Sequence, residues 1–326
     1  MAHDMNYRNL GLEIAHITES AAVAASRWVG RGDKNAGDGS AVDAMRKSFN
    51  TLDIDGVVMI GEGEKDDAPM LFKGERLGTG RGPAMDVAID PVEGTSLLAK
   101  GRPNSIATIS LAPQGTMFDP GPAFYMQKLA VQHEARDVVD LDMPIPDLLR
   151  KVARALGKDI RELTVFVLEK PRHENISREI FQAGARVQSH TDGDVAGALL
   201  AVTPESGVDL MLGTGGTPEG VLAATAVKVL GGQILGRLDP QSDEERKSVL
   251  DAGMDISRVY TVDDLVTSDD VYFAATGITQ GFLPGVKIEG HRITTTSVLM
   301  RGRNKTVRYI EAHHAFGKFG KELPVS

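Results

Sequence analysis

Six consecutive residues combine two carboxylates, a proline, a glycine and a hydroxyl: Asp90-Pro91-Val92-Glu93-Gly94-Thr95. Carboxylate oxygens are the ligands that hard cations such as Mg²⁺ and Mn²⁺ prefer. The stretch 96–100 is expected to form a short helix whose free N–H groups could receive an anion. A cation, an anion pocket and a hydroxyl able to orient water together predict metal-assisted hydrolysis of a phosphate ester. An aspartate turn with a capping threonine is the simpler alternative.

A second acidic run, Gly61-Glu62-Gly63-Glu64-Lys65-Asp66-Asp67, follows the apolar segment 56–60, which is expected to be a strand. Its flanking glycines let the backbone turn freely. Four carboxylates within seven positions repel one another. This repulsion is tolerable on a solvated loop, and it also suits a segment that surrounds a divalent ion.

A third charged segment, the stretch 30–39, contains Asp33, Lys34 and Asp38 among four glycines. Its composition predicts a loop between two helices. The simplest interpretation is a solvated loop in which Asp38 or Ser40 caps the next helix.

The second half of the chain has its strongest local pattern at Gly213-Thr-Gly-Gly-Thr-Pro-Glu-Gly220. A strand is expected to end at Leu212, with Thr217, Pro218 and Glu219 as N-cap, N1 and N2 of a helix. An acidic residue in a first turn is also favoured by the helix dipole alone. The segment lacks the Gly-Lys-Ser/Thr of a P-loop, and its spacing does not fit a dinucleotide-binding fingerprint.

Two further polar turns follow expected strands in this half: Lys170-Pro171-Arg172-His173 and Asp192-Gly193-Asp194. Ligands bind beyond the strand ends of α/β sheets. Arginine suits bidentate recognition of phosphate, and carboxylates suit sugar hydroxyls. An exposed basic turn is the alternative for the first of these segments.

The elements that must position these residues can be read from periodicity. Helical spacing of apolar residues predicts a helix over 10–28, and a second helix is expected over 40–50. Strands are expected at 56–60, 85–90, 105–111, 165–168, 186–189, 208–212 and 233–236, and strands joined by tight turns at 271–312. The pattern changes after about residue 144, and we place a domain boundary so that residues 1–158 and 159–326 form two subdomains.

Composition fits a cytosolic enzyme. The chain has 326 residues, 41% of them hydrophobic, and no cysteine, which excludes thiol hydrolases and cysteine zinc sites. Its net charge of −9 argues against nucleic acid and anionic membranes as partners. No secretory h-region and no apolar run of membrane-spanning length is found, so a cytoplasmic location is expected.

The paired motifs Gly-Glu-Gly-Glu at 61–64 and Asp-Pro-x-Glu-Gly-Thr at 90–95 resemble the lithium-sensitive, metal-dependent sugar-phosphatase superfamily. Most members of that superfamily read Asp-Pro-x-Asp-Gly-Thr, whereas this chain has Glu93. This departure and the segments 28–35 and 170–173 are features that the chain shares with bacterial class II fructose-1,6-bisphosphatases. The chain resembles that family over about residues 10–313. The resemblance implies a layered α-β-α-β-α fold, hydrolysis of the 1-phosphate of fructose 1,6-bisphosphate in gluconeogenesis, and a homo-oligomer, dimer or tetramer.

The resemblance also implies roles for individual residues. Two or more Mn²⁺ or Mg²⁺ ions would be held by five carboxylates: Asp38, Glu62, Asp90, Glu93 and Glu219. Catalysis would use Thr95, Asp66, Glu62 and Lys34. The substrate would contact Glu93, Gly94, Thr95, Tyr125, Lys170, Pro171, Arg172, Asp192, Gly193, Asp194 and Gly216. A dual enzyme that also accepts sedoheptulose 1,7-bisphosphate, an inositol-monophosphatase-like enzyme and a non-catalytic sugar-phosphate sensor remain alternatives.

Overall fold

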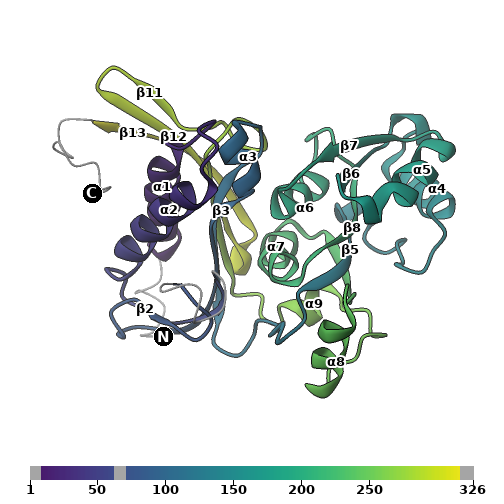
Figure 1. The fold of residues 1–326 in the computed structure, drawn as a ribbon, viewed down its shortest axis with the longest axis horizontal. Helices are drawn as coiled ribbons and strands as arrows, with labels where there is room; N and C mark the ends of the chain where they lie inside the picture. The colour runs from purple at the N-terminus through teal and green to yellow at the C-terminus, as the bar shows by residue number, and fades with distance from the viewer. Residues whose placement is uncertain (1–8, 62–70, 316–326) are drawn as a thin grey trace. The chain divides into compact units, whose positions relative to one another are not determined.

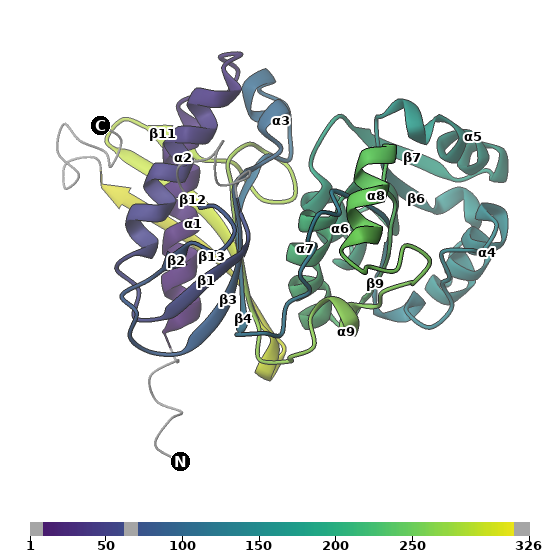
Figure 2. The same cartoon turned by 60° about the horizontal axis from the view of Figure 1, so that its bottom comes forward.

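The computed structural model describes residues 9–61 and 71–315. Glu62 and Asp66 lie outside these ranges, so the structure says nothing about their predicted roles. The chain divides into two compact units. Unit 1 comprises residues 1–117 and 268–326, and unit 2 comprises residues 118–267. Figures 1 and 2 show the ribbon from two directions.

Unit 1 is built on a mixed sheet of eight strands in the order β11-β12-β10-β4-β3-β1-β2, with β13 pairing the other edge of β12. Its strands are β1 (Asp55–Ile60), β2 (Arg76–Leu77), β3 (Ala84–Glu93), β4 (Ile106–Pro113), β10 (Tyr272–Gly277), β11 (Lys287–Glu289), β12 (Arg292–Arg301) and β13 (Thr306–Ala315). Its helices are α1 (Leu10–Ser26), α2 (Lys34–Phe49), α3 (Thr95–Lys100) and the 3₁₀ turn η4 (Gly302–Asn304). Helices α1 and α2 pack side by side on one face of this sheet (Figure 1).

Unit 2 contains a five-stranded mixed sheet in the order β7-β6-β8-β5-β9. Its strands are β5 (Tyr125–Val131), β6 (Thr164–Leu168), β7 (Arg186–His190), β8 (Leu210–Gly216) and β9 (Gln233–Leu238). Its helices are α4 (Ile145–Leu156), α5 (Glu174–Ala183), α6 (Asp194–Val202), α7 (Thr217–Leu230), α8 (Asp243–Asp251) and α9 (Val262–Leu265), with 3₁₀ turns η1 (His133–Ala135), η2 (Ile160–Glu162) and η3 (Pro171–His173). Helices α6 and α7 lie next to each other against the sheet, and α4 packs on α5 (Figure 2).

These two sheets confirm the predicted α/β class. The division of the chain differs from the predicted boundary at residue 158. Strand β10 pairs with β4, with Tyr272 opposite Leu111, so the C-terminal strands complete the N-terminal sheet. Sequence periodicity can indicate a strand but not its partner, and it therefore missed that unit 2 is one continuous stretch between β4 and β10.

Local boundaries also differ from the predictions. Strand β3 is buried along most of its length, and it continues past Asp90 to Glu93. Strand β8 continues past Leu212 to Gly216. The strand β5 was not predicted, because its polar residues interrupt the apolar pattern. Among the described residues, no helix is long and apolar enough to cross a membrane.

The predicted loop 30–39 is mostly helical, which corrects the sequence interpretation. Helix α2 begins at Lys34, and Asp33 is its N-cap, accepting a hydrogen bond from the Ala36 amide at 3.0 Å. Asp38 therefore lies within the helix and does not cap it. Glycine has a weak helix propensity, but at position 37 it allows α2 to pack closely on α3. A Cβ on Gly37 would lie only 2.3 Å from Leu98 Cδ2 in α3.

Two glycines of α2 provide a matched test of this packing. A Cβ on Gly39 would meet no atom within 4 Å, whereas one on Gly37 would also meet Trp28 Cβ at 3.2 Å. We expect Gly39→Ala to raise the free energy of unfolding by about 0.5–1 kcal/mol. Gly37→Ala should lower it by about 1–3 kcal/mol, because a packed interior tolerates added volume poorly. Urea unfolding of both variants measures the difference, and equal effects would contradict the packing of α2 on α3.

Candidate active site

The Asp-Pro-x-Glu motif forms a β-bulge at the end of β3. Asp90 lies opposite Thr108 of β4 and Glu93 lies opposite Ile106, so Pro91 and Val92 together oppose the single residue between them. Residues three apart in a regular strand point to opposite faces. The extra residue of the bulge cancels that alternation and puts the side chains of Asp90 and Glu93 on the same face of the sheet.

Proline fits this bulge because it has no amide to donate to the ladder. Asp90 stabilises the bend by accepting the Val92 amide at 3.0 Å. Glu93 is buried, with only 4% of the residue exposed. Gly94 then adopts a left-handed conformation, with φ of +83°, and caps α3, so that Thr95 becomes the first residue of that helix.

The segment that leads into α2 is tied to the same helix. The amides of Gly30 and Gly32 donate to the carbonyls of Leu98 and Ala99, each at 2.9 Å. The N-terminal turns of α2, which carry Lys34 and Asp38, are thereby fixed against α3. Unit 1 thus brings the predicted residues of the 30–39 segment close to the helix that begins at Thr95.

Asp38 is the carboxylate of this group with the most unusual environment. Burial raises its pKa from 3.8 to about 6. Its Oδ1 is buried and has no hydrogen-bond partner among the described residues. Two other buried carboxylates are satisfied: Asp86 accepts two backbone amides, and Asp209 accepts the Thr164 amide and pairs with Lys158.

In unit 2, the predicted residues Arg172 and Tyr125 lie at the end of β8. Arg172 donates from Nε and Nη2 to the Thr214 carbonyl, at 3.0 and 2.8 Å. Its guanidinium also lies 5.2 Å from the ring centroid of Tyr125. Tyr125 lies opposite Gly216 in the β5–β8 ladder. The strand end, Arg172 and Tyr125 are therefore one cluster.

The neighbouring His173 holds the same strand through both of its ring nitrogens. Its Nδ1 lies 2.8 Å from the Leu168 carbonyl, and its Nε2 accepts the Thr214 amide at 2.8 Å. The Nδ1 is then the protonated nitrogen, and burial lowers the pKa of the ring, so His173 is neutral at pH 7. Sequence reasoning assigned no role to this histidine.

Asp194 and Glu219 face this strand end from α6 and α7, the helices that follow β7 and β8. A Cβ on Gly215 would meet Asp194 Oδ2 at 2.0 Å, and one on Gly216 would meet Glu219 Oε2 at 1.7 Å. Only glycine leaves room for these carboxylates. Gly216 is the N-cap of α7, one residue earlier than predicted, so Glu219 is the third residue of the helix.

Glu219 is a half-buried acid whose charge is only partly compensated. Burial raises its pKa, and nearby Asp194 and Asp192 raise it further, whereas Lys128 lowers it. Its Oε2 has no hydrogen-bond partner among the described residues. Lys128 itself was missed by sequence reasoning because β5 was missed. The available signal was a lysine directly before the apolar run 129–131.

Buried polar atoms without a partner concentrate in and next to the segments that carry the predicted site residues. The described residues contain eight such side-chain atoms. Four belong to the segments discussed above, on Asp38, Asp194, Thr217 and Glu219, and a fifth is on Thr191, next to the 192–194 turn. Uncompensated buried oxygens are costly unless a ligand satisfies them. Oxygen donors of this kind fit a hard divalent cation, and two of the five predicted ligands, Asp38 and Glu219, are among them.

The described residues alone do not complete a metal site. No three His, Cys, Asp or Glu side chains within 9–61 and 71–315 lie close enough together to hold a metal ion. Predicted ligand Glu62 lies outside those ranges, and Glu219 belongs to the other unit. The five-ligand set therefore stays a prediction.

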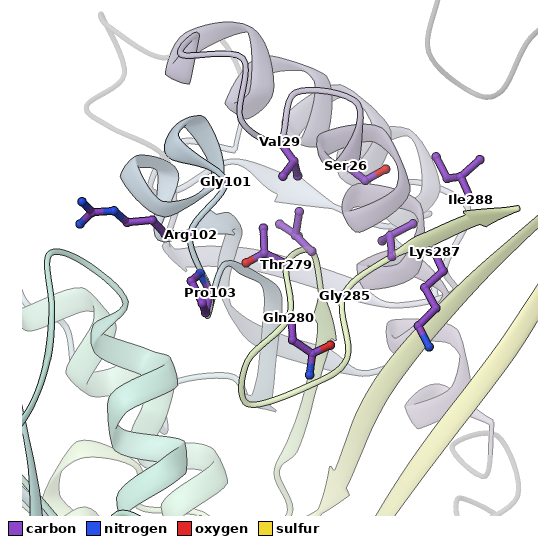
Figure 3. A pocket seen from close by; sticks show the side chains of 12 residues that line it. Ser26, Val29, Gly101, Arg102, Pro103, Thr279, Gln280, Gly285, Lys287 and Ile288 are labelled. Atoms are coloured by element: carbon purple, nitrogen blue, oxygen red, sulfur yellow. The ribbon is translucent and has the colours of Figure 1, made fainter.

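A cavity of about 470 Å³ lies elsewhere in unit 1. It is bordered by the end of α1, the loop after α3 and the segment leading into β11, with Ser26, Gly101, Thr279 and Lys287 on its wall (Figure 3). The side chains of Arg102 and Lys287 extend away from its centre (Figure 3). None of the predicted site residues lines it.

Comparison with known proteins identifies the class. A family described as "Bacterial fructose-1,6-bisphosphatase, glpX-encoded" matches residues 8–314, so the chain belongs to that family. More particularly, it is 43% identical to "Fructose-1,6-bisphosphatase 1 class 2" of Escherichia coli (strain K12) over 332 residues, covering 98% of each chain. The "Fructose-1,6-bisphosphatase class 2" of Shigella flexneri matches equally well. The resemblance predicted from the motifs is confirmed.

The pKa of Asp38 gives a pH-dependent prediction for the metal-free protein. A carboxyl whose pKa is raised on folding binds its proton more tightly in the folded state. The free energy of unfolding should therefore fall as the pH rises from about 4 to about 6. Asp38→Asn should remove this component, which is measured by thermal unfolding across pH 4–7 after chelation. An unchanged pH profile in the variant would contradict the burial of Asp38.

Proposed function

We propose that this chain hydrolyses the 1-phosphate of D-fructose 1,6-bisphosphate to D-fructose 6-phosphate and phosphate, the reaction used in gluconeogenesis. Family membership over nearly the full length supports this assignment. The observation that carries it is the set of buried, uncompensated carboxylate oxygens on Asp38, Asp194 and Glu219 beside glycine-rich turns. Such oxygens suit a cation and the hydroxyls of a sugar.

The metal ligands in this proposal are Asp38, Glu62, Asp90, Glu93 and Glu219. When bound there, two or more Mn²⁺ or Mg²⁺ ions would supply Lewis-acid charge beside the reacting phosphate. The bulge supports a shared role for Asp90 and Glu93, because it turns both side chains to one face. Which of the two metals is used is a question for metal titration.

Protein side chains would handle the water and the phosphate. The hydroxyl of Thr95, with Asp66 or Glu62, would orient the water that attacks in line with the leaving sugar oxygen. Lys34 would lie by the reacting phosphate, and Glu93 and Gly94 would contact the substrate. No phosphoenzyme is expected, since water attacks directly.

The cluster in unit 2 would hold the remainder of the sugar bisphosphate. Lys170, Pro171, Arg172 and Tyr125 would contact the phosphate that is not cleaved. Asp192, Gly193, Asp194 and the backbone of Gly216 would contact the sugar. Arg172 uses two of its N–H groups on Thr214, so its remaining groups would serve the phosphate. We also propose a cytoplasmic homo-oligomer, dimer or tetramer, which light scattering would test.

Phosphate release from a panel of sugar phosphates, with chelator and with Mn²⁺ or Mg²⁺, tests the assignment. Fructose 1,6-bisphosphate should be the best substrate, and activity should disappear with chelator and return with metal. Preference for inositol monophosphate would replace the assignment by a monophosphatase. Comparable rates with sedoheptulose 1,7-bisphosphate would define a dual enzyme. Binding of the substrate without turnover would indicate a sugar-phosphate sensor.

Thr95→Ala tests the orientation of the water. We expect kcat to fall by roughly 10²–10³, about 2.7–4 kcal/mol, as when one preorganised polar group is lost. KM should change little, and Thr95→Ser should keep much more activity. A large rise in KM at unchanged kcat would instead assign Thr95 to uniform substrate binding.

Lys170→Ala tests recognition of the distant phosphate more cleanly than a change at Arg172, which also anchors β8. We expect a loss of about 1.5–3 kcal/mol, the scale of a hydrogen bond to a charged group. This corresponds to a roughly ten- to hundredfold lower kcat/KM for fructose 1,6-bisphosphate. Activity on a small monophosphate and the thermal stability should barely change. Equal losses on both substrates would contradict the assignment.

A further inference from the structure

Lys128 is an unusual residue for the middle of a strand. Only 1% of it is exposed, and it is among the largest fully buried side chains of the described residues. A buried ammonium is costly unless it is paired and hydrogen-bonded. Its contacts should therefore reveal why the strand carries it.

The ammonium of Lys128 connects two segments that approach from different elements. It forms an ion pair with Asp194 at the start of α6, and it donates to the Gly216 carbonyl at 2.6 Å. Gly216 ends β8 and caps α7, the helix that carries Glu219. A single side chain thus links Asp194 to the turn that positions Glu219.

The surrounding glycines keep this arrangement tight. A Cβ on Gly220 would lie 3.0 Å from Lys128 Cδ, and a Cβ on Gly215 would lie 2.0 Å from Asp194 Oδ2. Lys128 also lies opposite Gly213 in the β5–β8 ladder, where no side chain obstructs it. The glycines at positions 213, 215 and 220 thus leave the space that the side chains of Lys128 and Asp194 occupy.

We propose that Lys128 is a positioning residue for the sugar-binding part of the site, holding Asp194 and the Gly216 carbonyl in the geometry that the sugar bisphosphate requires. This inference rests on the proposed function. A compact ammonium suits the task better than a guanidinium, because it places one point charge between two oxygens without a planar fork. It also balances the negative charge that Asp194 and Glu219 bring into the interior.

Lys228 offers a matched control in the same unit. It forms an ion pair with Asp263 at 2.7 Å and donates to the Val266 carbonyl at 2.7 Å, and only 9% of its side chain is exposed. It lies in the last turn of α7, the opposite end of the helix from Glu219. Its contacts therefore resemble those of Lys128 without reaching the candidate site.

The absence of cysteine from the chain allows a chemical rescue experiment. Lys128→Cys and Lys228→Cys are each alkylated in denaturant with 2-bromoethylamine and refolded with Mn²⁺. The thiolate forms a C–S bond and bromide leaves, which gives a lysine analogue at that one position. Iodoacetamide gives a matched neutral adduct. The wild-type chain passes through the same treatment.

We expect Lys128→Cys, unmodified or with the neutral adduct, to raise the KM for fructose 1,6-bisphosphate at least tenfold. The aminoethyl adduct should return KM to within about threefold of wild type. Neither form of Lys228→Cys should change KM by more than about twofold, even where its melting temperature falls. A loss of stability is expected in both variants, whereas a change in KM is expected only at Lys128. KM therefore distinguishes a positioning role from a purely structural one.

A folded Lys128 variant with a neutral side chain and wild-type KM would overturn the proposal. So would failure of the aminoethyl adduct to restore KM while the aminoethylated Lys228→Cys chain refolds normally. If no neutral form of the Lys128 variant folds, Lys128→Arg keeps the charge but not the geometry, and a wild-type KM in that variant would equally overturn it. If the wild-type chain releases no phosphate from the bisphosphate, the proposed function fails instead. The role of Lys128 is then tested by calorimetry. The affinity for the bisphosphate should fall at least tenfold in the neutral Lys128 variants and recover with the aminoethyl adduct.

Discussion

The burial of carboxylates is the constraint on which this structure depends. A buried charge requires a partner, and most of the buried acids have protein partners: Glu75 pairs with Arg46, and Asp209 pairs with Lys158. Asp38 and Glu219 instead keep an oxygen without a hydrogen-bond partner among the described residues, and burial raises the pKa of both. The fold thus holds acids in positions that lower the stability of the folded chain when no cation is bound. Such positions are typical of binding sites rather than of structural ion pairs.

Backbone irregularities position these acids. The bulge at Pro91 places Asp90 and Glu93 on one face, although their spacing of three would separate them in a regular strand. Gly215 and Gly216 leave the volume that the carboxylates of Asp194 and Glu219 occupy. Each of these irregular residues, the proline and the two glycines, has a weak propensity for its element, and the surrounding sheet and helices compensate for that weakness. Local propensity and function conflict here, as expected at a functional site.

The sequence predicted the α/β class, most strand and helix cores and the family, because these depend on periodicity and on short motifs. It did not predict that β10 completes the N-terminal sheet, since strand pairing between distant segments leaves no local signal. It treated 30–39 as a loop, because the helix there is stabilised by contacts of Gly37 with Leu98 rather than by propensity. The roles of Lys128 and His173 were also not predicted, because they too depend on packing contacts. Their importance lies in contacts with Asp194 and Thr214, which are distant in sequence.

The two units carry chemically different groups of the predicted residues, and this has consequences for how substitutions should act. Unit 1 contributes acids on a bulge and a helix, whose proposed task is to hold cations and orient water. Unit 2 contributes a cluster held by Arg172, His173 and Lys128 around the end of β8, whose proposed task is to hold the sugar and its distant phosphate. Interactions present in both ground state and transition state change KM, whereas those made only in the transition state change kcat. Substitutions in unit 2 that leave Glu219 in place should therefore appear mainly in KM, and those at the bulge mainly in kcat.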